Sequence, residues 1–257
     1  MNTLTNKLKP RGRFSGVVQI VRFNWPQYVI ATAMLLAAYY VMHRSVLPSW
    51  ASLCVTVAVL AGLWWSVASL VASHWVYDRS ELMRWEWLQR ELPRPVRRWL
   101  NVHAGLDEST PALRALWPAA VGDTVDIFAP DEMTAGSIHR ARDKRGAPAR
   151  RVNYRVLPFV ASEFDTVFLL FAIHELRHPD ARRKFFTEVR RVLASTGQVV
   201  LVEHLRDWPN LAAYGPGFLH FHSRRTWRGD IAAAGLKIER EFCLTPFVGV
   251  FILRGKP

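Results

Sequence analysis

The sequence predicts an α/β protein with a doubly wound, mostly parallel sheet, preceded by a hairpin of two transmembrane helices. Two observations lead to this prediction. Two uncharged apolar segments fill most of the first eighty residues, and from about Arg97 onward strand-like and helix-like segments alternate. A chain of 257 residues is long enough for one α/β domain and an additional element.

The two apolar segments run from Pro26 to Met42 and from Trp50 to Trp75. A helix rises about 1.5 Å per residue, so each segment can cross a hydrocarbon core of about 30 Å, the first only just. Aromatic residues near the segment ends fit the aromatic belt of a membrane interface. The alternative is a buried helical hairpin in a soluble domain.

The cations of the chain give the predicted orientation. The formal net charge is +13, and cations cluster before the first segment and after the second, while the connection between them holds only His43 and Arg44. This asymmetry predicts that both termini and the sheet domain are cytoplasmic in an integral membrane protein, with the bacterial inner membrane as the expected location. Anionic lipid is the expected partner of the basic flanks, and without a nucleic-acid reader motif no nucleic acid is expected.

The remainder of the chain is expected to fold into alternating elements. The buried stripe of the helix near residue 185 is formed by Phe185, Phe186, Val189, Val192 and Leu193, and the last two strands are expected to pair antiparallel. Ligands in such sheets bind beyond the carboxyl ends of the strands. The expected strands are 98–105, 123–130, 150–159, 164–173, 198–205, 236–247 and 248–255, and the expected helices are 109–119, 131–146, 178–197 and 223–235.

Several motifs resemble those of the class I S-adenosylmethionine-dependent methyltransferase superfamily, over about residues 77–254. They are the segments "LPFVASEFDTVFLLFAIHEL" and "RRKFFTEVRRVLASTGQVVLVEH", which include His174, Glu188, Gly197 and Glu203. The resemblance implies a Rossmann-like seven-stranded methyltransferase sheet and S-adenosylmethionine as cofactor. The domains are then a basic tail (1–22), a transmembrane hairpin (23–76), a connecting helix or lid (77–96) and a methyltransferase-like domain (97–257).

The sequence departs from the family in its glycine-rich loop. Either "TVDIFAPDE" is the first strand with a glycine-free loop, or "WLNVHAGLD" is the first strand and loop. The second alignment is preferred, because it completes the set of strands and brings Asp126 to the family's ribose-binding position, with Asp131 as its rival. The acids after Gly105 are expected either to hold the methionine ammonium group or to cap the following helix. The resemblance assigns cofactor binding to His103, Ala104, Gly105, Asp107, Asp126 and, beside the adenine, Leu157, Pro158 and Phe159.

Polar side chains follow the fourth and fifth expected strands, where the acceptor meets the methyl group in this family. His174 or His204 is the expected general base, with Glu203 as a third catalytic group. An alternative is a network of ion pairs, such as Arg177–Glu203 and Arg206–Glu175. No metal is expected, because the spacing matches no metal motif. The expected substrate-binding residues are Tyr77, Glu175, Arg177, Arg206, His220 and His222.

The combined prediction is a membrane-anchored S-adenosylmethionine-dependent methyltransferase. The anchor favours a lipophilic acceptor, such as a lipid, a quinone precursor or an aryl or polyene lipid, methylated on oxygen or carbon. Two alternatives are a non-catalytic methyltransferase-like scaffold in a membrane complex and a soluble methyltransferase with a helical cap. The sequence makes no prediction of oligomeric state.

Overall fold

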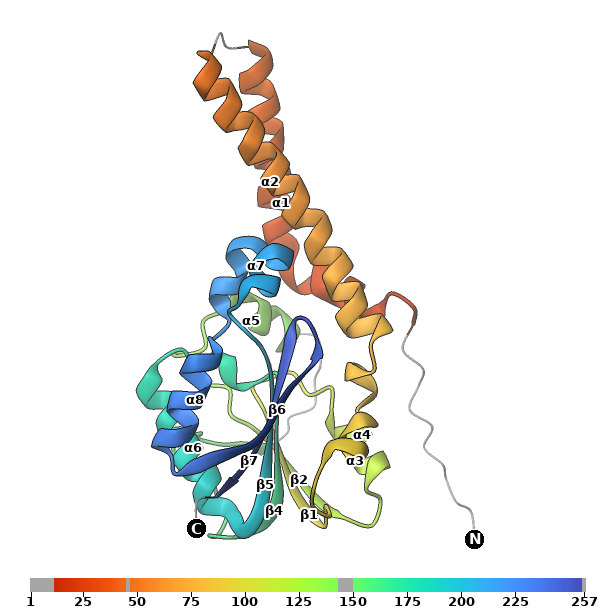
Figure 1. Cartoon of the computed structure of the whole chain (residues 1–257), viewed down its shortest axis with the longest axis vertical. Helices are drawn as coiled ribbons and strands as arrows, with labels where there is room; N and C mark the ends of the chain where they lie inside the picture. Colours follow the sequence, from red (N-terminus) through yellow and green to blue (C-terminus); the bar gives the residue numbers. More distant parts are fainter. Residues whose placement is uncertain (1–11, 45–46, 143–149, 256–257) are drawn as a thin grey trace.

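The computed structural model describes residues 12–44, 47–142 and 150–255. Its centre is one seven-stranded sheet in the order β3-β2-β1-β4-β5-β7-β6 (Figure 1). Neighbouring strands pair in parallel from β3 to β5, and β7 is antiparallel to both β5 and β6. The predicted doubly wound sheet with a final antiparallel hairpin is confirmed. The strands are β1 (Arg98–His103), β2 (Val121–Asp126), β3 (Arg150–Arg151), β4 (Phe164–Leu170), β5 (Leu193–His204), β6 (Leu236–Thr245) and β7 (Val248–Gly255).

The central strands are apolar because helices cover both faces of the sheet. One core cluster joins side chains of β4 and β5 to α6 (Pro179–Val192) and α8 (Arg224–Ala233). A second cluster packs the opposite face against α3 (Trp87–Glu91) and α4 (Thr110–Leu116). The predicted apolar stripe is fully buried, although Leu193 begins β5 rather than ending the helix.

Two predicted elements are shorter than expected. The helix expected from residue 131 begins at Gly136 and is described as α5 (Gly136–Arg142), and residues 143–146 lie outside the described part. Glu132, within the expected first turn, instead accepts hydrogen bonds from Tyr154 and Arg155. The strand expected over 150–159 reduces to β3, because Asn153 Oδ1 accepts the Arg155 amide and turns the chain.

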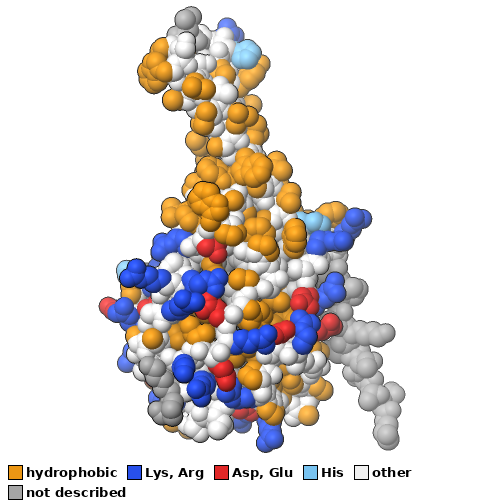
Figure 2. Space-filling view, in the orientation of Figure 1, with side chains coloured by type: hydrophobic (Ala, Val, Ile, Leu, Met, Phe, Trp, Pro, Cys, Tyr) orange, Lys and Arg blue, Asp and Glu red, His pale blue; other side chains and the backbone are white. Residues whose placement is uncertain are grey.

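A helical hairpin extends from the domain (Figure 1) and consists of α1 (Ser15–Arg44), α2 (Ser49–His74) and the π-helical turn η1 (Trp75–Arg79). α1 begins inside the predicted tail and contains Pro26 two residues after non-helical Asn24. Apolar side chains cover most of the visible surface of the hairpin (Figure 2). Among the described residues, one helix, 49–79, is long and apolar enough to cross a membrane, so the first of the two predicted spans is not matched by a second such helix.

The base of the hairpin is joined to the domain. Asp78 accepts hydrogen bonds from the amides of Gly16 and Val17, at 2.6 and 3.2 Å, and so caps the start of α1. Position 16 must be small, because a Cβ there would lie 2.5 Å from that of Tyr77. The two helices of the hairpin are thereby fixed to each other at the domain surface.

The hairpin base rests on a loop and two short helices that follow the strands. Gln19 of α1 donates to Glu108 after β1, and the Phe23 carbonyl accepts from Arg140 after β2, at 2.9 and 2.6 Å. On the other side, α2 packs on α7 (Trp208–Tyr214), where Trp64 Nε1 donates to the Ala212 carbonyl at 3.1 Å. The hairpin therefore rises from the carboxyl edge of the sheet, the edge at which doubly wound sheets bind ligands.

Candidate active site

Gly105 lies directly beyond β1, in a backbone conformation that few other residues adopt. Its φ is +99°, and the His103 Nδ1 accepts the Gly105 amide at 3.2 Å. Since this nitrogen is an acceptor, the proton of the neutral ring is assigned to Nε2, a buried atom without a hydrogen-bond partner in the described structure. Burial lowers the pKa of His103 and keeps its ring neutral. The end of β1 thus offers an unsatisfied buried donor beside a glycine turn.

Asp126 ends β2 directly opposite His103 in the parallel register. One carboxylate oxygen accepts the Phe128 amide at 2.9 Å, and the other accepts from Arg142 Nη1 of α5 at 2.5 Å. The Arg142 guanidinium also lies 4.2 Å from the centre of the Phe128 ring. A Cβ at position 105 would lie 2.7 Å from Arg142 Nη1, so this side chain covers both Gly105 and Asp126.

The acids after Gly105 have structural contacts. Asp107 accepts the amides of Ser109 and Thr110, at 3.2 and 2.9 Å, and so caps α4. Glu108 accepts from Gln19 of the hairpin. These bonds match the helix-capping alternative for Asp107, and the assignment of either acid to an ammonium group stays a prediction.

Leu157, Pro158 and Phe159 lie away from Gly105 and Asp126. They line a cavity of about 670 Å³ together with Arg98, which begins β1, and Glu163, which precedes β4. Glu188 and Arg191 of α6 bind their backbone there. The prediction that these residues lie beside the adenine does not fit this position, because the chain turns at Asn153. Val152 and Asn153 follow β3 instead, and the Val152 amide donates to the Asp126 carbonyl at 2.9 Å.

Glu203 fixes the loop beyond β4. It is the last residue but one of β5, and its fully buried carboxylate accepts the amides of Ile173 and His174 and pairs with His174 Nδ1 at 2.7 Å. Burial disfavours a charge on His174, but the carboxylates of Glu203 and Glu175 outweigh that cost and raise its pKa to about 10. His174 is therefore protonated at neutral pH, unlike an ordinary general base.

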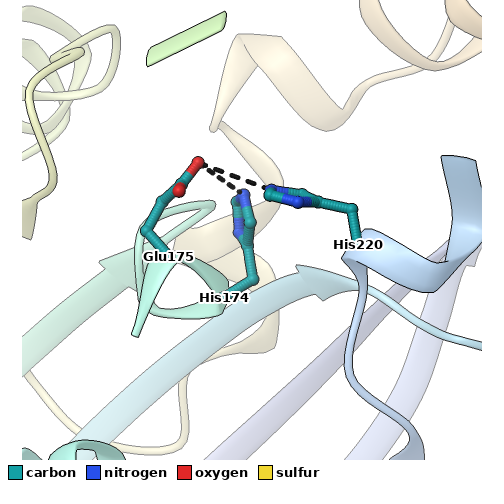
Figure 3. A group of neighbouring side chains, drawn as sticks. All are labelled: His174, Glu175 and His220. Carbon is teal, nitrogen blue, oxygen red and sulfur yellow. Dashed lines mark ion pairs between the residues drawn. The ribbon is translucent and has the colours of Figure 1, made fainter. Parts of the chain in front are cut away.

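His174, Glu175 and His220 point toward one another (Figure 3). Glu175 Oε1 lies 3.5 Å from His174 Nε2 and 3.6 Å from His220 Nε2. Burial opposes ionisation of Glu175, but hydrogen bonds to the two histidines lower its pKa below the usual range. The three side chains lie close enough to hold a metal ion as ligands. Within the protein the charges of His174 and Glu175 already compensate each other, and the absence of a metal stays a prediction.

His204 is neutral and faces the hairpin. Its Nδ1 lies 3.0 Å from the Phe247 carbonyl, which can only accept, so Nε2 accepts from the Tyr77 hydroxyl at 2.7 Å. Burial, and to a lesser extent His174, lowers the pKa of His204 to about 4. The predicted residues Tyr77 and His204 thus meet, and both ring nitrogens of His204 have hydrogen-bond partners within the protein.

The predicted ion pairs of Arg177 and Arg206 are wrong. Glu203 pairs with His174, and Arg177 donates to the backbone carbonyls of His174, Leu219 and His220. Arg206 and His222 instead line a separate cavity with Arg182. The sequence interpretation missed Arg142 and Asn210, which binds Asp207 and the Phe247 carbonyl beside His204. Only the three-dimensional arrangement brings these groups to the site.

Residues 113–201 match the model of a family described as "Methyltransferase domain". A methyltransferase from Aquifex aeolicus, described as SAM-dependent, has a similar fold, with a TM-score of 0.52 and 17% identity over 68% of this chain and 93% of that one. The PH0226 protein from Pyrococcus horikoshii gives a TM-score of 0.50 and 15% identity over 68% and 90%. The sheet domain therefore has the fold of the class I S-adenosylmethionine-dependent methyltransferases, and part of it matches the sequence model of a methyltransferase domain. No curated protein matches the chain.

The matched family implies S-adenosylmethionine as cofactor, and the ends of β1 and β2 carry groups that can bind it. The unpaired His103 Nε2 is a donor for the cofactor's carboxylate, and the Asp126 carboxylate is an acceptor for ribose hydroxyls. Gly105 allows a close backbone approach. Arg142 occupies this position in the structure, so its side chain must move before the cofactor can bind.

Proposed function

We propose that this protein is a membrane-anchored S-adenosylmethionine-dependent methyltransferase with a lipophilic acceptor. The observation that carries the proposal is the position of the apolar hairpin, whose base contacts the segments that follow β1, β2 and β5. A hairpin inserted in a bilayer would hold the carboxyl edge of the sheet against the membrane surface. An acceptor dissolved in that membrane would reach the site without crossing water.

The exposed apolar surface of α2 supports membrane insertion. Leu53, Val57, Leu60, Trp64 and Val67 are all well exposed, an arrangement that is unfavourable in water and favourable in lipid. The proposed orientation has both termini in the cytoplasm, with the sheet domain at the bacterial inner membrane. Lipids, quinone precursors and aryl or polyene lipids are the proposed acceptors, with transfer to oxygen or carbon.

The residues of the site are assigned the following roles. Bound S-adenosylmethionine supplies an electrophilic methyl group; His103 and Asp126 hold its polar ends. His220 takes the proton of the acceptor, because it is the more exposed histidine beside the Glu175 carboxylate. Protonated His174, held by Glu203, keeps Glu175 ionised so that this carboxylate stabilises the His220 imidazolium. His204 positions Tyr77 at the hairpin base.

The test combines cofactor binding with methyl transfer. Purified full-length protein in detergent is titrated with S-adenosylhomocysteine, and labelled methyl transfer into a membrane lipid extract is followed. Asp126→Ala is expected to lose binding, while Asp131→Ala, the exposed rival acid, retains it. Alkaline carbonate extraction of membranes tests the anchor, and protein in the supernatant contradicts it.

One observation favours a second candidate, a non-catalytic methyltransferase-like scaffold. Arg142 covers Gly105 and pairs with Asp126, which closes the cofactor position in this conformation. Absence of S-adenosylhomocysteine binding in both the wild type and Arg142→Ala supports the scaffold. Binding by either protein supports the enzyme.

A further inference from the structure

Five arginines line a cavity beyond β4 and β5 that plays no part in the proposed chemistry. The cavity has a volume of about 520 Å³, and its acidic lining consists of Asp230 alone. Such an excess of positive charge around a concave site favours an anionic ligand. The arginines, called the arginine pocket below, are Arg177, Arg182, Arg183, Arg206 and Arg225.

Three of these arginines are held in place by the protein. Asp230 accepts from Arg182 Nε at 2.6 Å and from Arg183 Nε at 3.2 Å. Arg177 binds backbone carbonyls of the neighbouring loops. The wall of the pocket is therefore ordered before any ligand arrives, which lowers the entropic cost of binding.

The other two arginines carry the argument. In the described part of the chain, the exposed side chains of Arg206 and Arg225 have no hydrogen-bond or ion-pair partner, although they line the same cavity as Arg182. An arginine fork matches the geometry of phosphate oxygens and binds them in a bidentate manner. Asp230 is already engaged by two guanidinium groups, so it does not neutralise Arg206 or Arg225.

Two helix starts add to the positive potential, and the buried histidine beside them carries no charge. Pro179 begins α6 and Arg225 lies in the first turn of α8, so the amide-rich ends of both helices face the cavity. Burial and the charges of Arg182 and Arg177 lower the pKa of His222 to about 3. His222 is therefore neutral, with Nε2 3.3 Å from Arg182 Nη1.

The pocket lies on the hairpin side of the domain. Arg206 follows β5, and two residues later Trp208 begins α7, the helix on which α2 packs. The Trp208 side chain is 76% exposed, and Leu219 in the next helical turn is also exposed. Exposed tryptophan beside arginine is typical of the interfacial layer of a membrane, where lipid phosphates lie.

We propose that the arginine pocket binds a phosphate group, carried by a lipid headgroup at the bilayer surface or by a soluble phosphate ester. The pocket would hold the phosphate between the fixed wall of Arg182 and Arg183 and the two exposed guanidinium groups of Arg206 and Arg225. This site does not depend on the cofactor, since none of its residues belongs to the cofactor position.

The experiment uses full-length protein in a non-ionic detergent and three probes in calorimetry. Dioctanoyl phosphatidic acid carries the phosphate on a lipid, glycerol 1-phosphate carries it alone, and dioctanoylglycerol is the same lipid without it. We expect saturable binding of one or both phosphate probes and none of dioctanoylglycerol. Binding of phosphatidic acid alone identifies a lipid headgroup as the source, while equal binding of both probes identifies the phosphate ester.

Matched variants assign the binding to the pocket. Arg206→Ala/Arg225→Ala is expected to weaken phosphate binding by at least about tenfold, because two charge-assisted contacts are lost. The control Arg84→Ala/Arg97→Ala removes the same charge from exposed positions outside the pocket and is expected to leave binding unchanged. Thermal melting and S-adenosylhomocysteine binding of each variant establish that it is folded.

Three results overturn the proposal: no saturable binding of either phosphate probe, equal binding of dioctanoylglycerol, or an equal loss in the two double variants. A protein that binds phosphate but not S-adenosylhomocysteine retains this site and loses the methyltransferase proposal. The two proposals therefore fail separately.

Discussion

Arg142 is expected to compete with the cofactor, so its removal should strengthen cofactor binding. Its guanidinium forms a 2.5 Å ion pair with Asp126 and lies over the Phe128 ring. The arginine side chain is 27% exposed, so water screens the pair and its worth is about 1 kcal/mol, the stacking contact included. Since 1.4 kcal/mol corresponds to about tenfold, Arg142→Ala should lower the dissociation constant by about fivefold.

The assay is calorimetric titration with S-adenosylhomocysteine, which lacks the sulfonium charge, so that removal of a nearby cation does not itself change the affinity. Arg142→Lys keeps the charge without the planar fork and should bind between wild type and Arg142→Ala. Arg155→Ala, which removes an exposed arginine paired with Glu132, serves as control. Weaker binding by Arg142→Ala than by wild type would refute the reasoning, because the arginine would then be part of the cofactor site.

Three further predictions concern stability, pH and metal. Asp230→Ala should lower the free energy of unfolding in a urea titration by about 3 kcal/mol, because it leaves the buried Arg182 guanidinium without its carboxylate. The control Asp180→Ala removes an exposed carboxylate 3.7 Å from Arg183 and should change that free energy little. Because the pKa of His174 is raised in the folded protein, its protonated form stabilises the fold fully below pH 6.5, and this contribution is lost as the pH rises toward 10. The pKa values of His204 and His222 are lowered, so these residues destabilise the fold as the pH falls from 6.5 toward 4 and 3. Melting temperatures across this range should therefore peak near pH 6.5. If Glu203→Gln shows the same decrease in melting temperature above pH 6.5 as the wild type, the His174–Glu203 pair is not the cause of that decrease. EDTA should leave methyl transfer unchanged within about twofold, and one tightly bound metal per chain by elemental analysis would show that His174, Glu175 and His220 are ligands.

The sheet was predictable because burial on both faces leaves a strong mark on the sequence. The uninterrupted apolar run predicts β4 and the helical spacing of apolar residues predicts α6, and both elements are confirmed. β3 and α5 lie at the edge of the sheet, where little apolar surface is buried. Their lengths depend on single polar contacts, such as the Asn153 turn, which a local pattern does not reveal.

The site was predictable in location but not in its contacts. Parallel strands bring the residues after β4 and β5 to one edge, so His174, Glu175 and Glu203 meet as expected. The partners of arginines are a different matter, since a long flexible side chain reaches several groups. Arg142 of α5 pairs with Asp126, which precedes it by 16 residues, and Arg206 faces a cavity rather than Glu175.

The base of the hairpin supports the same loops that form the site. Tyr77 bonds to His204 at the end of β5, and Gln19 binds the loop after β1. Gly215 lies so close to Trp65 of α2 that a Cβ would come within 2.6 Å of its ring. A side chain on the hairpin therefore completes the packing around the strand ends, and the hairpin is more than a tether. This coupling explains why an apolar hairpin and the sheet domain form one unit: insertion of the hairpin would fix the height of the strand ends above the bilayer and thereby the depth from which an acceptor is taken.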